Sequence, residues 1–255
     1  MDMGLRDRVV LVTGSSSGIG RATAIAFGRE GARVGVTYRN NREQAEDTAR
    51  HVIDAGGQAL VSPYDLASQE SIQTVMHTLL EQWGSIHVLV NNAVQWGNVE
   101  DLVHTPLFEE VPTSSWKRTL DLGLAGVYQT IQRAVPAMRR QQWGRIVTLS
   151  SSVVEDAFPG AAPYATAKAG LHGLHRVLAS ELGSAGILAN VVLPGFTLTE
   201  KNQRLIPQSM RDGVARQTPT GRLTTPEDVA ALIVFLGSAA NGHVNGEFVR
   251  VNGGI

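Results

Sequence analysis

Short apolar runs alternate along the chain with longer segments in which apolar residues recur every three or four positions. The runs are rich in β-branched residues, as expected of buried strands, whereas the longer segments have the period of helices that cover a sheet. The alternation predicts an α/β fold with a parallel sheet wrapped by helices on both faces. We expect seven strands, at Val9–Val12, Val34–Thr37, Ala59–Ser62, His87–Val90, Arg145–Leu149, Leu188–Leu193 and Glu247–Val251.

The helix-like segments lie between these runs. The last of them begins with Thr225, Pro226, Glu227 and Asp228, which is the order expected of an N-cap, a first-position proline and a first acidic turn. No repeat, low-complexity stretch or linker interrupts the pattern, so we expect one domain over residues 1–255. The predicted helices are Gly18–Glu30, Arg42–Ala55, Ser68–Trp83, Ser114–Gln141, Pro163–Leu182 and Thr225–Leu236.

Composition excludes several classes of function. A net charge of -1 gives no basic surface for nucleic acid, and no apolar run is long enough for a membrane helix. The absence of cysteine excludes disulfides and thiolate-bound metal. His172 and His175 have no partner at metal-ligand spacing, so we expect no metal site and read both as helix-surface or interface residues. Together with an N-terminus that lacks a basic leader, these features predict a cytoplasmic protein.

A glycine-rich loop, Thr13-Gly14-Ser15-Ser16-Ser17-Gly18-Ile19-Gly20, follows the first strand and opens the first helix. Gly14 allows a sharp turn, while Gly18 and Gly20 let backbone approach a ligand and the sheet. The N-terminus of the helix offers N–H groups to anionic oxygens. In this setting we favour binding of a dinucleotide pyrophosphate over a glycine turn without a ligand.

Tyr164 and Lys168 stand four residues apart in a predicted helix and therefore share one of its faces. We expect the ammonium to favour the charged phenolate and so to lower the pKa of Tyr164 from about 10. A phenol tuned in this way could exchange a proton with a substrate oxygen. Taken alone, the pair is better explained as a chance pattern, with the tyrosine packed in a core and the lysine solvated.

The order of the motifs decides between these alternatives. The glycine loop is followed by Asp65-Leu66, Asn91-Asn92-Ala93, Ser151, the Tyr164–Lys168 pair and Pro194-Gly195. As a set they resemble the short-chain dehydrogenase/reductase superfamily, in the single-domain branch similar to bacterial 3-oxoacyl-carrier-protein ketoreductases. The resemblance implies a doubly wound Rossmann fold and an NAD(P)-dependent oxidoreductase acting on alcohol or carbonyl groups.

The resemblance also implies roles for individual residues. Ser151 would hydrogen-bond the substrate carbonyl, Tyr164 would act as acid or base, and Lys168 would hold the nicotinamide ribose. Asp65 would contact the adenine amino group, Asn91 would line the adenine-ribose side, and Thr199 would contact the carboxamide. The expected cofactor-binding residues are Gly14, Ser16, Ser17, Gly18, Ile19, Gly20, Tyr38, Arg39, Asp65, Leu66, Asn92, Ala93, Tyr164, Lys168, Pro194, Gly195, Thr197 and Thr199.

Cofactor choice is read at the end of the second strand, where an acid would accept the ribose 2′-hydroxyl of NAD. Tyr38 and Arg39 stand there instead, and a guanidinium suits a 2′-phosphate. We therefore favour NADP(H) over NAD(H). Two points count against this preference: Ser17 occupies a position where many NADP-preferring relatives have arginine, and Arg39 could be merely solvated.

Two positions depart from the family pattern. Gly123 stands where relatives have an asparagine that helps to hold a water of the proton relay, and Val94 replaces a glycine. Gly123 retains the main-chain carbonyl, so we expect an active enzyme and little effect of Gly123→Asn on the rate, with either a local kink in the helix or another arrangement of the water. The alternative is a catalytically impaired protein of the same fold that only binds the dinucleotide.

The substrate is predicted from the residues around the pocket mouth. The stretch Val94–Ser115 is longer than in the relatives and would overhang the pocket. Apolar walls would suit a bulky or polycyclic ketone such as an aromatic polyketide, unless these side chains pack on one another or on a neighbouring subunit. The resemblance further implies a homotetramer. The expected substrate-binding residues are Ser151, Val153, Tyr164, Trp96, Phe158 and Phe196.

Overall fold

Valine, leucine and isoleucine dominate the central strands, and the structure pairs them into one parallel sheet. The computed structural model describes residues 2–94, 107–157 and 159–255. Within that part the strand order is β3-β2-β1-β4-β5-β6-β7, and every neighbouring pair is parallel. All seven expected strands are confirmed, with shifts of a residue or so at their ends. They are β1 (Val9–Val12), β2 (Arg33–Tyr38), β3 (Gln58–Pro63), β4 (Val88–Asn91), β5 (Gly144–Leu149), β6 (Ile187–Pro194) and β7 (Phe248–Val251).

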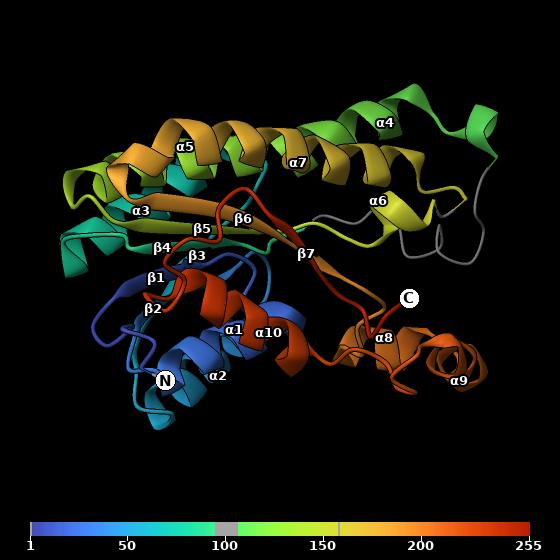
Figure 1. Cartoon of the computed structure of the whole chain (residues 1–255), viewed down its shortest axis with the longest axis horizontal. Coiled ribbons are helices and arrows are strands. Elements are labelled where there is room, and N and C mark those ends of the chain that lie inside the picture. Colours follow the sequence, from blue (N-terminus) through green and yellow to red (C-terminus); the bar gives the residue numbers. More distant parts are fainter. Residues whose placement is uncertain (1, 95–106, 158) are drawn as a thin grey trace.

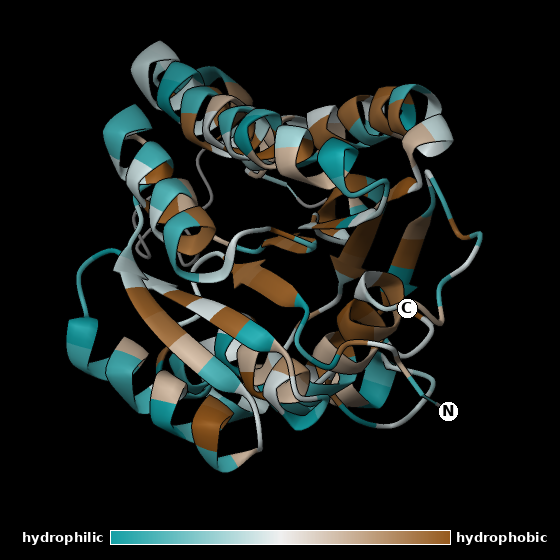
Figure 2. Cartoon of the chain, turned by 90° about the vertical axis from the view of Figure 1, so that its left-hand side faces the viewer, coloured by the Kyte–Doolittle hydropathy of each residue, from teal (hydrophilic) through white to brown (hydrophobic). Residues whose placement is uncertain are grey.

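Helices cover both faces of the sheet, as expected of a doubly wound Rossmann fold (Figure 1). Two apolar clusters fill the space between the sheet and these layers. Figure 2 shows hydrophobic strands in the centre and hydrophilic residues along the outer sides of the helices. One layer holds α1 (Gly18–Arg29), α2 (Arg42–Asp54) and α10 (Pro226–Gly237), and the other holds α3 (Gln69–Trp83), α4 (Thr113–Leu120), α5 (Gly126–Arg140) and α7 (Ala162–Leu182).

The long helix expected at Ser114–Gln141 is interrupted. A π-helical turn, η3 (Asp121–Ala125), separates α4 from α5. Gly123 lies at the centre of this turn, so the helix is irregular where the glycine stands. A Cβ at Gly123 would lie 2.9 Å from the Cβ of Ala167 in α7, so the missing side chain lets η3 approach α7 closely.

Short helices lie beyond the carboxyl ends of the strands. Two of them occupy residues 200–217, where we expected no helix, and the side chain of Thr199 caps the first by accepting a hydrogen bond from the Asn202 amide at 3.2 Å. No helix in the described ranges is long and apolar enough to span a membrane. These elements are η2 (Phe108–Glu110), α6 (Val153–Asp156), η4 (Gly183–Ala185), α8 (Glu200–Leu205) and α9 (Gln208–Gln217).

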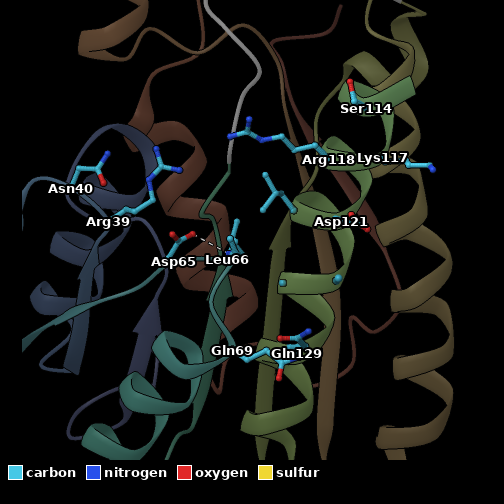
Figure 3. A pocket seen from close by; sticks show the side chains of 14 residues that line it. Arg39, Asn40, Asp65, Leu66, Gln69, Ser114, Lys117, Arg118, Asp121 and Gln129 are labelled. Atoms are coloured by element: carbon cyan, nitrogen blue, oxygen red, sulfur yellow. Dashed lines mark hydrogen bonds between the residues drawn. The ribbon is translucent and has the colours of Figure 1, made fainter. Parts of the chain in front are cut away.

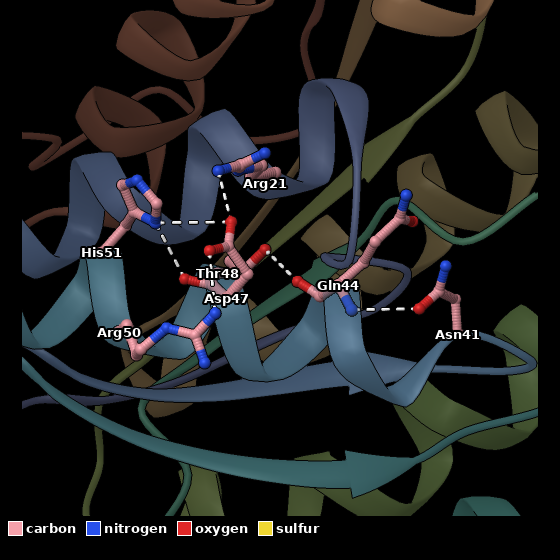
Figure 4. A network of polar contacts seen from close by, with 7 residues as sticks. All are labelled: Arg21, Asn41, Gln44, Asp47, Thr48, Arg50 and His51. Atoms are coloured by element: carbon pink, nitrogen blue, oxygen red, sulfur yellow. Dashed lines mark hydrogen bonds and ion pairs between the residues drawn. The ribbon is translucent and has the colours of Figure 1, made fainter.

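A polar network fastens α2 to α1 on one side of the glycine loop (Figure 4). Arg21 donates to the Asp47 carboxylate at 2.6 Å, and Arg50 donates to the other oxygen of that carboxylate at 3.0 Å. Asn41 caps α2 by accepting from the amide of Gln44. The hydrogen bond from Arg50 and the nearby cations hold the pKa of Asp47 below its usual value. The helix that follows the glycine loop, α1, is thus held in place by its neighbour α2.

The strand order reverses between β1 and β4, since β2 and β3 continue to one side of β1 while β5 to β7 continue to the other. Loops leaving two such strands turn to opposite faces, and the crevice between them is where open α/β sheets bind ligands. The glycine loop follows β1, and Asn92 and Ala93 follow β4. The candidate site therefore lies at this point of the fold.

Candidate active site

The glycine loop is folded tightly at the start of α1. Gly14 and Gly18 have φ angles of +66° and +54°, a region that side chains disfavour. A Cβ at Gly20 would overlap the carbonyl oxygen of Gly14, so the first turn of the helix lies directly on the loop. The first amide groups of a helix have no acceptor within it, and here they are available to an anionic ligand together with Ser16, Ser17 and Ile19. This cradle fits the pyrophosphate of a dinucleotide.

Side chains at the ends of β1, β2 and β4 hold the loop. The Thr13 hydroxyl accepts from the amides of Asn92 and Ala93, both at 3.0 Å. The Asn92 side chain donates to the carbonyls of Thr13 and Gly14 at 2.9 and 3.1 Å. The Thr37 hydroxyl accepts from the Gly14 amide at 2.8 Å. Asn92 thus braces the loop, and sequence reasoning missed Thr13 and Thr37, although hydroxyl residues at adjacent strand ends could have indicated them.

The segment after β6 closes the other side of the cradle. A Cβ at Gly18 would meet the Thr199 methyl group at 3.2 Å, so this segment lies against the glycine loop. Gly195 comes close to Asn252 in the same way, and the Thr197 hydroxyl bonds the Gly195 carbonyl at 3.0 Å. The structure therefore brings Thr199 to the glycine loop, while Pro194, Gly195 and Thr197 lie earlier in the same segment.

A cavity of about 950 Å³ lies between the loops after β2 and β3 and the helix α4–η3 (Figure 3). Its walls include Arg39, Asp65 and Leu66, three of the residues expected at the adenosine half of the cofactor. The Asp65 carboxylate accepts from the Ala67 amide at 2.9 Å. Tyr38 is the last residue of β2, directly before Arg39. Sequence reasoning missed the opposite wall, to which α4 contributes Ser114, Lys117 and Arg118.

Ser151, Tyr164 and Lys168 come together at the start of α7. Ser151 follows β5, and its hydroxyl accepts from the Val153 amide at 3.3 Å and hydrogen-bonds Tyr164. Lys168 is 7% exposed, and its ammonium donates to the Leu149 carbonyl at 2.7 Å. The same ammonium lies 5.8 Å from the centre of the Tyr164 ring. The three residues expected to act together therefore occupy one place.

The lowered pKa that we expected for Tyr164 is wrong for this structure. Burial raises the pKa of Tyr164 above its usual value, and the hydrogen bond from Ser151 opposes this only in part. The pKa of Lys168 is lowered to about 8, also by burial. Burial disfavours the charged form of each group, and the Lys168 ammonium is directed to the Leu149 carbonyl. Both groups are thus held closer to neutrality than in water.

The two histidines of α7 differ from expectation. His175 is fully buried rather than on the helix surface; its Nδ1 bonds the Leu171 carbonyl at 3.0 Å, and burial lowers its pKa to about 4. His172 is half-buried, stacks on Phe248, and bonds the Ser150 hydroxyl at 2.9 Å. The helix is covered on that side by β6 and β7, which the spacing of the two residues did not reveal. Within the described residues no group of acidic residues and histidines is arranged to hold a metal.

Part of the expected substrate pocket lies outside the described residues. Trp96 and Phe158 are among residues 95–106 and 158, which the structure does not describe. Val153 and Phe196 are half-buried, close in sequence to Ser151 and to the segment after β6. Asn91 is 3% exposed and donates to the Thr148 hydroxyl at 3.1 Å, so the structure gives it a partner within the sheet.

Known proteins resemble the chain over nearly its whole length. A family model described as enoyl-(acyl carrier protein) reductase matches residues 14–255. The 3-oxoacyl-(acyl-carrier-protein) reductase of Staphylococcus aureus is 34% identical over 96% of both chains, and that of Thermotoga maritima is 34% identical over 99% of both. A solved 7α-hydroxysteroid dehydrogenase complexed with NADH and 7-oxoglycochenodeoxycholic acid superposes with a TM-score of 0.91 at 28% identity, covering 99% of this chain and 96% of that one.

Proposed function

Because the chain belongs to the short-chain dehydrogenase/reductase family and is therefore an NAD(P)-dependent oxidoreductase, we propose that it reduces a ketone at the site formed by Ser151, Tyr164 and Lys168. The observation that carries the proposal is the hydrogen bond between Ser151 and Tyr164 beside the buried Lys168. Two hydroxyl groups that touch each other can both bond one carbonyl oxygen.

In this proposal each residue has one task. The Ser151 hydroxyl donates to the carbonyl oxygen and positions it, and the Tyr164 hydroxyl gives that oxygen a proton as the carbonyl carbon receives a hydride. Lys168 holds the ribose, and its ammonium offsets the negative charge of the phenolate that remains once Tyr164 has transferred its proton. The bound nicotinamide supplies the hydride in reduction and accepts it in oxidation. With its pKa raised by burial, Tyr164 carries the proton that it must donate, and it is at the same time a weaker acid than a free phenol.

We also propose that the enzyme prefers NADP(H). Arg39 is exposed at the end of β2 beside the cavity, where a 2′-phosphate would find a guanidinium and no carboxylate from the same loop. The structural relative named above was solved with NADH, so a fold of this kind can also hold the dinucleotide that lacks the 2′-phosphate. The preference therefore depends on Arg39 and its surroundings.

The substrate proposed is a bulky or polycyclic ketone. Phe108 of η2 and Met210 of α9 are 79% and 55% exposed, and both elements follow carboxyl ends of strands, as does Phe196. Apolar side chains around a mouth suit a large apolar substrate. The ketone in the structural relative is a bile acid derivative, which supports this class, whereas the named activity of the curated relatives makes a 3-oxoacyl thioester the natural competitor.

A panel of ketones with NADPH tests the reaction. We expect the wild type to oxidise NADPH with polycyclic ketones faster than with a short 3-oxoacyl thioester.

Tyr164→Phe removes only the proton donor, so it should lose about a thousandfold or more in kcat, in the range of acid–base catalysis combined with positioning. Its affinity for NADPH should stay within about twofold. Retained turnover in this variant would remove Tyr164 from the mechanism. NADPH binding without reduction of any ketone would favour a catalytically impaired protein.

The cofactor preference has a separate test. Arg39→Met keeps the length of the side chain and removes its charge, so NADPH binding should weaken by about tenfold, as for loss of a charge-assisted hydrogen bond, with little change for NADH. Titration of both dinucleotides by fluorescence measures the two affinities. Equal losses would assign Arg39 a structural role, and a wild type that binds NADH more tightly would overturn the preference.

A further inference from the structure

The cavity between the loops after β2 and β3 and the helix α4–η3 carries a second guanidinium on the wall opposite Arg39. Figure 3 shows the side chains of Arg39 and Arg118 turned toward each other across the mouth, whereas Lys117, the neighbour of Arg118, points away from it. Arg39 comes from the loop after β2 and Arg118 from α4, so two separate elements present the charges. Both residues are exposed and can reach a ligand at the mouth.

Two guanidinium groups that face each other can bind an anion between them. Neither guanidinium has an ion pair or hydrogen bond within residues 2–94, 107–157 and 159–255, whereas Arg21, Arg33 and Arg222 are paired with carboxylates at 2.5 to 3.0 Å. Like charges that face each other repel unless a counter-ion joins them. A phosphate dianion can accept hydrogen bonds from two guanidinium groups at once.

The remaining walls are suited to the base rather than to a charge. Leu66 is 8% exposed, and with Leu122 and Ala125 it gives the cavity an apolar face against which a planar ring can lie. Asp65 supplies a carboxylate within the cavity. These residues would suit a purine, which would leave the two guanidinium groups for an anionic substituent on the sugar.

We propose that Arg118 is a second residue that determines cofactor specificity and that, with Arg39, it holds the 2′-phosphate of NADP(H) from the opposite wall. The inference rests on the proposed preference for NADP(H) and adds α4 to the residues that recognise the cofactor. It also provides a cation on a different element from the position before Gly18, where Ser17 stands.

Fragments without nicotinamide test this independently of turnover. Binding of 2′-phospho-ADP-ribose and of ADP-ribose is measured by calorimetry on the wild type, Arg118→Met and Arg140→Met. Arg118→Met should weaken the phosphorylated fragment by about tenfold and ADP-ribose by less than about twofold, in line with loss of a charge-assisted contact. Arg140→Met is the matched control, because it removes an exposed guanidinium at the end of α5, away from the residues that line the cavity, and it should change neither affinity by more than about twofold at physiological salt.

Each result has one meaning. Equal weakening of both fragments by Arg118→Met would place Arg118 against the base and overturn the proposal, as would no weakening at all. In Arg39→Met/Arg118→Met the losses should be non-additive, because both residues bind one phosphate. A wild type that binds both fragments equally would instead refute the preference for NADP(H) itself. Circular dichroism of the variants establishes that the fold is retained.

Discussion

At the scale of single residues, Lys168 is the group whose burial has the clearest cost. The pKa of its ammonium is lowered to about 8 in the folded chain and returns to about 10.5 on unfolding. Below pH 8 both states carry the proton and the buried charge costs stability. Between pH 8 and 10.5 the unfolded chain binds more protons than the folded chain, so the free energy of unfolding rises with pH in this window.

Lys168→Met should therefore be more stable than the wild type at pH 7, and its advantage should shrink between pH 8 and 10 as the wild type loses the charge. Urea denaturation at pH 7, 8, 9 and 10 measures this difference. Lys201→Met removes an exposed ammonium and serves as the control, with a difference that stays constant over the series. A constant difference for Lys168→Met as well would mean that burial does not shift its pKa.

The roles of single residues were predicted from motif order, but their environments were not. Ser151, Tyr164 and Lys168 meet as expected, because their spacing fixes them on one strand end and one helix face. The raised pKa of Tyr164 and the burial of His175 result from the packing of other segments around these two side chains. Such packing is a tertiary effect, and the four-residue spacing of Tyr164 and Lys168 does not predict it.

At the scale of elements, the contact between η3 and α7 couples two helices that carry different parts of the site. Gly123→Asn would place a Cβ at 2.9 Å from that of Ala167, so the expectation of a small effect does not hold for the single variant. Overpacking of this kind costs about 1–3 kcal/mol. The variant should melt at a lower temperature and lose activity, because α7 carries Tyr164 and Lys168.

Gly123→Asn/Ala167→Gly should recover stability relative to the sum of the two single variants, because the second change removes the clashing methyl group. The recovery is limited by the cost of about 1 kcal/mol for glycine in a helix. Gly173→Asn is the control, since no atom lies within 4 Å of a Cβ at Gly173. Strict additivity in calorimetric melting of the four proteins would show that the contact is not tight.

Elements were more predictable where periodicity was long. The strands and the six main helices follow from apolar spacing, whereas α8 and α9 did not, because they are short, largely polar helices without a buried residue. The break at η3 was anticipated only from a glycine in a helix. The close approach of η3 to α7 is a distance between elements and not a property of one segment, so no pattern within Asp121–Ala125 could predict it.

At the scale of the whole molecule, the proposed tetramer needs apolar surface on the α5 and α7 layer. Tyr128 of α5 and Val177 of α7 are 51% and 52% exposed. We expect sedimentation velocity at micromolar concentration to give a tetramer and Tyr128→Arg to give smaller species. Ile53→Arg, at a 55% exposed position of α2 on the other layer, should leave the tetramer intact. A wild-type monomer would refute the assembly.

The π-helical turn also sets the rotational phase of the chain that precedes it. An α-helix turns by about 100° for each residue, so deleting one residue within Asp121–Ala125 would let α4 and α5 join as one regular helix while rotating α4 by that angle about its axis. Arg118 would leave the cavity and another face of α4 would replace it. The irregular turn thus acts as a one-residue spacer that decides which side chains of α4 a cofactor meets.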